Sequence, residues 1–205
     1  MGPIDTLVLG IGNILWADEG FGVRAVAALN AGWRFPDQVV LMDGGTQGLY
    51  LLPHVQSARR VLVLDAIDYG LPAGTLRVLR DDEIPGEAAA GKLSPHQASF
   101  QEVMFLARLA GRVPEQAAVV GVQPETLADF GGSLSDTVRA RLPDAIAAVL
   151  DFLAAWGHEP VPRTGEPPSL MQASLDIESY EQGRPPAEDA CRIGDARVLA
   201  MRGYR

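Results

Sequence analysis

The feature that most constrains the fold is a run over residues 60–66, R-V-L-V-L-D-A, in which apolar and polar residues do not alternate. A strand that is apolar on both sides is typical of a parallel sheet with helices on both faces. Four more short strands are predicted, over residues 6–9, 39–42, 75–79 and 117–122. The turn L-P-A-G at 71–74 indicates that the strand after it is an antiparallel edge strand.

Helical patterns alternate with these strands. Helices are predicted over residues 20–30, 49–55, 94–109 and 135–156. The third has a strong start, with Ser94 as N-cap, Pro95 in the first turn and Gln97 completing a capping box. The fourth contains Pro143, which is expected to kink it. This alternation predicts an α/β domain with a mostly parallel sheet of about five strands and helices on both faces.

The chain divides in composition at Gly157. Residues 1–157 are predicted to form one domain, which suits a chain of 205 residues. Six of the fifteen prolines lie in residues 158–205, which are predicted to form a Pro-rich, partly ordered tail with one short helix around 170–182. Docking of this tail on the domain is expected to involve Leu175, Ile177 and Tyr180; the alternative is a dispensable extension.

Composition excludes several classes of partner. A net charge of −9 and the lack of a Lys/Arg-rich run argue against nucleic acid. No window approaches the ~20 apolar residues of a membrane span, so no membrane insertion is expected, and the cytoplasm is the simplest location. Cys191 is the single cysteine, which excludes an internal disulfide and a multi-cysteine zinc site; it is interpreted as an incidental thiol. The protein is expected to be a monomer.

The glycine-rich turn after the first strand is not a dinucleotide-binding fingerprint. Gly10 and Gly12 match its first two glycines, but Leu15 stands where the third is needed, and Glu19 would repel a pyrophosphate. The chain also lacks the G-x-S-x-G elbow of α/β hydrolases and the H-E-x-x-H motif of zinc proteases.

Three residues form a candidate metal site. Glu19 and Asp65 follow predicted strands, and His96 is the second residue of a predicted helix. Ligands sit outside the carboxyl ends of parallel strands, and two carboxylates with one imidazole suit a first-row divalent ion. Each residue alone also has a structural interpretation: a charge at a helix start, a strand-end cap and a first-turn residue. Spacing leaves the two interpretations open.

Five motifs occur in order across about residues 5–157. They are L-V-L-G-I-G-N-I-L-W-A-D-E-G-F-G-V-R at 7–24, D-G-G-T at 43–46, L-D-A-I at 64–67, K-L-S-P-H-Q at 92–97 and V-V-G-V-Q-P-E at 119–125. Together they resemble the hydrogenase maturation endopeptidases, which process the large subunit of nickel-iron hydrogenases. The resemblance is greatest to members that serve uptake-type, membrane-associated enzymes.

This resemblance implies a phosphorylase/hydrolase-like three-layer α/β/α sandwich. It implies that Glu19, Asp65 and His96 contact nickel already loaded into the large-subunit precursor, so that nickel is a recognition element supplied by the substrate; other divalent ions can occupy such a site. The enzyme would then remove a short C-terminal extension from the precursor. A weak, exchangeable metal site is expected in the isolated protein.

The mechanism is open at this point. Asp43 matches a family motif and is the candidate catalytic residue, either as a general base or in an aspartic-type pair with Asp65 or Asp68. It could instead only cap its own glycine turn. Nickel in the substrate could also polarise the scissile carbonyl. The alternative functions are a non-hydrolytic metal-binding assembly chaperone for the same subunit and a hydrolase of small molecules.

Overall fold

A five-stranded sheet forms the centre of the computed structural model, which describes residues 4–84, 103–127, 129–172 and 175–184. The strands, in the spatial order β3-β1-β4-β6-β5, are β3 (Val39–Gly45), β1 (Ile4–Ile11), β4 (Ala58–Ala66), β6 (Gln116–Val122) and β5 (Leu76–Arg80). All neighbours are parallel except β5, which is antiparallel to β6. The predicted mostly parallel sheet and its antiparallel edge strand are confirmed.

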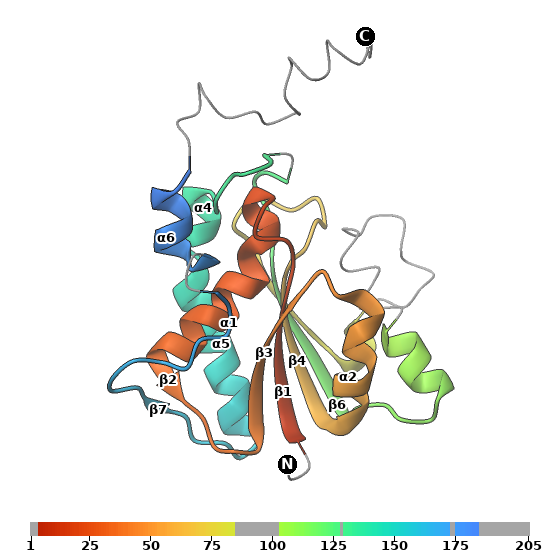
Figure 1. Cartoon of the computed structure of the whole chain (residues 1–205). Coiled ribbons are helices and arrows are strands. Elements are labelled where there is room, and N and C mark those ends of the chain that lie inside the picture. Colours follow the sequence, from red (N-terminus) through yellow and green to blue (C-terminus); the bar gives the residue numbers. More distant parts are fainter. Residues whose placement is uncertain (1–3, 85–102, 128, 173–174, 185–205) are drawn as a thin grey trace.

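Helices cover both faces of this sheet (Figure 1). The helices on one face are α1 (Phe21–Gly32), α4 (Asp136–Arg139) and α5 (Leu142–Ala155). The other face carries the 3-10 turn η2 (Gly48–Leu51), α2 (Leu52–Ser57) and the helical residues 103–109. Strand β4 sends Leu62 and Leu64 into one core and Val61 and Val63 into the other, which explains its unbroken apolar run. The three-layer α/β/α sandwich is confirmed.

One of the helix predictions needs correction. The expected continuous helix over 135–156 is two helices, α4 and α5, separated at Ala140 and Arg141. Pro143 lies in the first turn of α5, where its missing N–H is tolerated, so the chain restarts a helix here and does not kink one. The start of the helix predicted over 94–109 lies outside the described residues, whereas 103–109 are helical.

The tail has a shorter helix than predicted. Helix α6 spans Ile177–Gln182 and starts at Asp176, whose carboxylate accepts a hydrogen bond from the Ser179 N–H at 3.0 Å. An unpredicted two-stranded pair, β2 (Trp33–Arg34) with β7 (Val161–Pro162), joins the tail to the chain after α1. The division at 157/158 stays a prediction. No helix in the described ranges is long and apolar enough to cross a bilayer.

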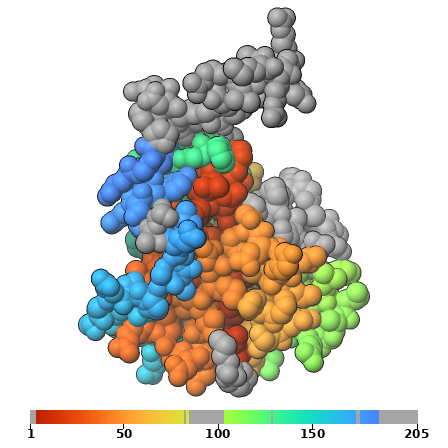
Figure 2. All heavy atoms as spheres, viewed as in Figure 1, coloured from red at the N-terminus to blue at the C-terminus, as the bar shows by residue number. Residues whose placement is uncertain are grey.

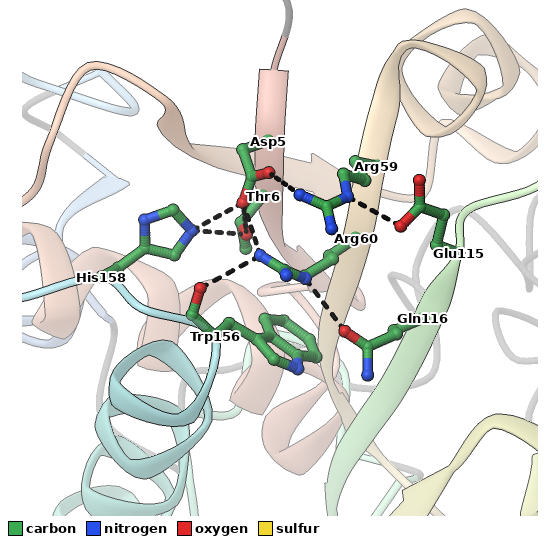
Figure 3. A network of polar contacts seen from close by, with 8 residues as sticks. All are labelled: Asp5, Thr6, Arg59, Arg60, Glu115, Gln116, Trp156 and His158. Carbon is green, nitrogen blue, oxygen red and sulfur yellow. Dashed lines mark hydrogen bonds and ion pairs between the residues drawn. The ribbon is translucent and has the colours of Figure 1, made fainter.

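A polar cluster holds the start of the tail at the amino ends of the strands (Figure 3). The His158 Nε2 lies 2.9 Å from both Thr6 Oγ1 and Asp5 Oδ2. Arg60 binds the Asp5 carboxylate at 2.8 Å and donates to the Trp156 carbonyl at 3.1 Å. Thr6, His158 and Asp5 have the composition of a catalytic triad. Both oxygens contact the same imidazole nitrogen, however, so the ring cannot relay a proton between them. The cluster is structural.

Helix α1 packs unusually close to the sheet because two glycines face each other. A Cβ on Gly22 would lie 2.0 Å from the Leu64 carbonyl oxygen and 2.3 Å from that of Ile11. A Cβ on Gly10 would lie 2.4 Å from the Gly22 carbonyl oxygen. Contacts this short involve backbone on both sides, so rotamer changes cannot relieve them. Any side chain here would push α1 off β1 and β4.

We therefore expect Gly22→Ala to destabilise the protein although alanine favours helices. Overpacking against backbone should cost about 1–3 kcal/mol or more. Gly32→Ala, in the last turn of the same helix, is the matched control: nothing lies within 4 Å of its added Cβ. That variant should gain up to about 1 kcal/mol. Urea unfolding of both variants checks this. Equal effects would show that close packing does not fix α1.

Candidate functional site

The candidate site lies at the carboxyl ends of β1, β3 and β4. After β1 the chain turns at Gly12 and enters the 3-10 helix η1 (Ala17–Gly20), which leads directly into α1. Gly12 has φ +128°, and a Cβ there would lie 1.8 Å from the Glu19 carbonyl oxygen. Only glycine allows η1 to fold back over the end of β1 in this way. The turn therefore sets where Glu19 stands.

Asp18, the neighbour of Glu19, is structural. It is fully buried, and its carboxylate accepts hydrogen bonds from the N–H groups of Glu125, Thr126 and Ser135 at 2.7–2.9 Å and from the Ser135 hydroxyl at 3.0 Å. These bonds attach η1 to the loop after β6. Of the acidic pair 18–19, Asp18 thus holds the loop.

Glu19 and Asp65 lie close enough to interact electrostatically. Asp65 ends β4, is 3% exposed and accepts a hydrogen bond from the Ala66 N–H at 2.8 Å. Burial raises the pKa of Asp65 well above its ordinary value, the Ala66 N–H opposes this, and the charge of Glu19 raises the pKa further. A buried carboxylate whose charge is disfavoured by burial and by a second carboxylate is the arrangement that a divalent cation would stabilise.

The third predicted ligand, His96, lies outside the described residues. Within the described ranges no group of three or more His, Cys, Asp or Glu side chains could hold a metal ion. The structure thus brings two of the three predicted ligands together, Glu19 from η1 and Asp65 from β4. Their role as metal ligands stays a prediction.

Asp43 lies near the end of β3, on the other side of β1. Its Oδ1 accepts a hydrogen bond from the Gly45 N–H at 2.9 Å, so it does cap its own glycine turn. Burial raises the pKa of Asp43, while this hydrogen bond and the charge of Arg24 act in the opposite direction. A half-buried carboxylate with a raised pKa is a better proton acceptor than an ordinary one. Capping and catalysis are compatible here.

The sheet separates Asp43 from both predicted partners. Gly10 of β1 pairs with Asp43 on one side and with Leu64 on the other, so the backbones of Asp43 and Asp65 are roughly 10 Å apart. Strand alternation places Asp43 on the face of α1 and Asp65 on the face of α2. Asp68 is engaged elsewhere, accepting from Gly70 N–H at 3.2 Å and Gln123 Nε2 at 3.1 Å. A carboxylate pair sharing one proton is therefore not favoured.

A small cavity of about 260 Å³ opens beside Asp43. The side chains and backbone that line it come from the turn after β1, the start of α1, the end of β3 and the tail; they are Gly12, Asn13, Ile14, Leu15, Val23, Asp43, Gly45, Thr46 and Leu175. The sequence predicted that Leu175 docks on the domain, and its carbonyl does contact Arg24, but no sequence pattern indicates that Leu175 reaches this cavity. Arg24, whose charge acts on Asp43, lies in the motif at 7–24, which by itself does not indicate a site role for it.

Known proteins resemble this chain both in sequence and in fold. The model of the hydrogenase maturation protease family matches residues 23–152. The hydrogenase expression/formation protein HoxM of Cupriavidus necator is 50% identical over 196 residues, 94% of this chain and 97% of the relative. HupM of Azotobacter chroococcum is 54% identical over 96% of this chain and 94% of its own length. The solved structure of the hydrogenase maturating endopeptidase HybD from Escherichia coli superposes with a TM-score of 0.73 at 39% identity, covering 78% of this chain and 98% of that one.

The raised pKa of Asp65 predicts a pH-dependent stability. Between the ordinary pKa and the raised one, the folded protein holds more protons than the unfolded chain, so stability falls as pH rises across this interval. Asp65→Asn is neutral and keeps the acceptor for the Ala66 N–H. We expect it to have a higher Tm than the parent at about pH 7 and a smaller decrease in Tm from about pH 4 upward.

Thermal unfolding across this pH range checks the prediction, with Asp37→Asn, in an exposed turn, as the control. A Tm of Asp65→Asn that follows the parent curve at every pH would show that the buried carboxylate carries no such penalty.

Proposed function

This chain belongs to the hydrogenase maturation protease family, and from that premise we propose that it is an endopeptidase that removes the C-terminal extension of a nickel-loaded hydrogenase large-subunit precursor. The observation that carries the proposal is the placement of Glu19 beside the buried Asp65 at the carboxyl edge of the sheet. The reaction would take place in the cytoplasm, before the large subunit joins its partner.

Nickel belongs to the substrate in this proposal. Glu19 and Asp65, with His96, would bind the metal that the precursor carries and thereby recognise a loaded subunit. Asp65 must lose its proton to bind a cation, and burial favours the protonated form. The resting protein would therefore bind free metal weakly, and recognition would strengthen as pH rises. Such a site distinguishes loaded from empty precursor without retaining metal itself.

Asp43 is the proposed general base. It would accept a proton from a water molecule as that water attacks the scissile carbonyl, and the proton would then pass to the departing amine. The Gly45 N–H fixes one carboxylate oxygen, which leaves the orientation of the group defined. Because Asp43 and Asp65 are on opposite faces of the sheet, Asp43 is proposed to act singly and not as half of an aspartic-type pair.

We expect purified protein to shorten nickel-loaded precursor, as read by mass spectrometry. Glu19→Gln, Asp65→Asn and His96→Ala should each reduce processing at least about 100-fold by weakening recognition of the metal. Asp43→Asn should lower kcat by roughly 10²–10⁴ while the variant still binds precursor, since a general base contributes about that much. Asp37→Asn is the control and should process normally.

Two outcomes would redirect the proposal. Tight binding of loaded precursor without shortening would favour the assembly-chaperone function. Normal processing by His96→Ala would remove the metal-recognition role, although not the peptidase activity.

A further inference from the structure

The described parts of the tail contact helix α1 at points from Gly32 to Arg24. At the C-terminal end of α1, the Arg163 N–H donates to the Gly32 carbonyl at 2.8 Å, and its Nε donates to the Asn30 carbonyl at 2.7 Å. Further along, Asn30 Nδ2 donates to the Pro168 carbonyl at 2.6 Å. Figures 1 and 2 show the tail, in blue, on the side of the molecule where α1 lies and α6 beside α4. The tail thus runs from the end of α1 towards its start, where the site is.

Arg24 holds the part of the tail that reaches the site. Its side chain is nine-tenths buried or more, Nη1 donates to the Leu175 carbonyl, and the guanidinium lies 5.2 Å from the centre of the Tyr180 ring. Helix α6 is also held by Glu181, which pairs with Arg139 of α4 and accepts a hydrogen bond from the Ser133 hydroxyl at 2.5 Å. Several contacts of different kinds, from α1 and from the loop into α4, therefore fix where Leu175 stands.

Leu175 closes one side of the cavity beside Asp43. Ile14, Leu15 and Val23 supply further apolar surface there, and Gly12 and Gly45 expose backbone. At about 260 Å³ the cavity is below the range of about 300–1,000 Å³ typical of drug-sized ligands, so it suits one or two side chains. An apolar lining next to one carboxylate is suited to an apolar side chain of a peptide whose backbone passes Asp43.

The lengths of the related proteins support a special role for Leu175 at this cavity. HybD matches nearly its whole length to about four fifths of this chain, whereas HoxM matches nearly all of this chain. The sheet and its helices up to α5 end at Ala155, and the residues up to that point make up about the share of this chain that HybD covers. HybD is thus long enough to match this domain without the tail, which makes the contact from Leu175 an addition to the shared domain.

We propose that Leu175 is a specificity-determining residue, which contacts an apolar side chain of the precursor peptide next to the bond that is cut. Arg24 is a positioning residue, which holds Leu175 in place through its backbone carbonyl. This inference rests on the proposed endopeptidase function. It adds that the tail supplies part of the peptide-binding site and so selects among precursors by an apolar side chain.

The test compares Leu175→Ala with Leu175→Met and Leu170→Ala in the full-length protein. Leu170 packs against the core and lines a different cavity, so Leu170→Ala weakens the packing of the tail while it keeps the side chain of Leu175 and the Arg24 contact to its carbonyl. Cleavage kinetics and equilibrium binding are measured with nickel-loaded precursor. Leu175→Ala should raise KM and Kd roughly tenfold with kcat changed less than about twofold, because a lost apolar contact weakens ground state and transition state alike.

Leu175→Met, similar in volume, should bind within about twofold of the parent, and so should Leu170→Ala. The precursor residues that flank the cut are replaced by alanine one at a time. For one of these precursor variants, Leu175→Ala should cause no further loss of binding. Parent-like KM and Kd for Leu175→Ala, or equal losses in Leu170→Ala, would overturn the inference. If the parent protein binds precursor without cleaving it, the proposed function is contradicted, while the Kd values still test the role of Leu175. If the parent protein neither binds nor cleaves precursor, the proposed function and the role of Leu175 are both contradicted.

Discussion

The close packing of α1 on β1 and β4 is the constraint on which the other features depend. Gly10 and Gly22 bring backbone against backbone, so the start of α1 is fixed relative to the ends of β1 and β4. Glu19 precedes α1, whereas Val23 and Arg24 lie in its first turns and face the cavity, the tail and Asp43. A small displacement of this helix would move all of these groups together.

Two buried acids, Asp18 and Asp65, show how hydrogen-bond partners give different roles to the same chemical group. Asp18 is fully buried, and four hydrogen-bond donors surround its carboxylate, which is the setting in which a buried charge is tolerated. Asp65 is nearly as buried but has one backbone donor and the charge of Glu19 nearby, so its ionised form is disfavoured. The first arrangement stabilises a loop, and the second leaves a carboxylate that gains from a cation.

The sheet divides the site into two halves. Asp65, on which the charge of Glu19 acts, lies towards the face of α2, and Asp43 with its cavity lies on the face of α1 and the tail. In the proposed function the first half recognises the metal carried by the substrate, and the second half receives the peptide. A substrate that contacts both halves would have to cross the carboxyl end of β1, which lies between them. Recognition and cutting can then be altered separately, because different elements supply them.

Local sequence patterns were enough to predict the sheet, its antiparallel edge strand, the turn at Gly12 and the candidate acids, because strands and glycine turns depend on neighbouring residues. The helical pattern predicted one long helix with Pro143 inside it. This prediction was wrong, because a proline is easily accommodated only in the first turn of a helix. Tertiary structure alone decided that Asp18 binds a loop more than 100 residues away, that Asp43 and Asp65 face opposite sides, and that Arg24 meets Leu175 across 151 residues. Local patterns do not specify which distant groups a buried charge will meet, because chain topology brings those groups together.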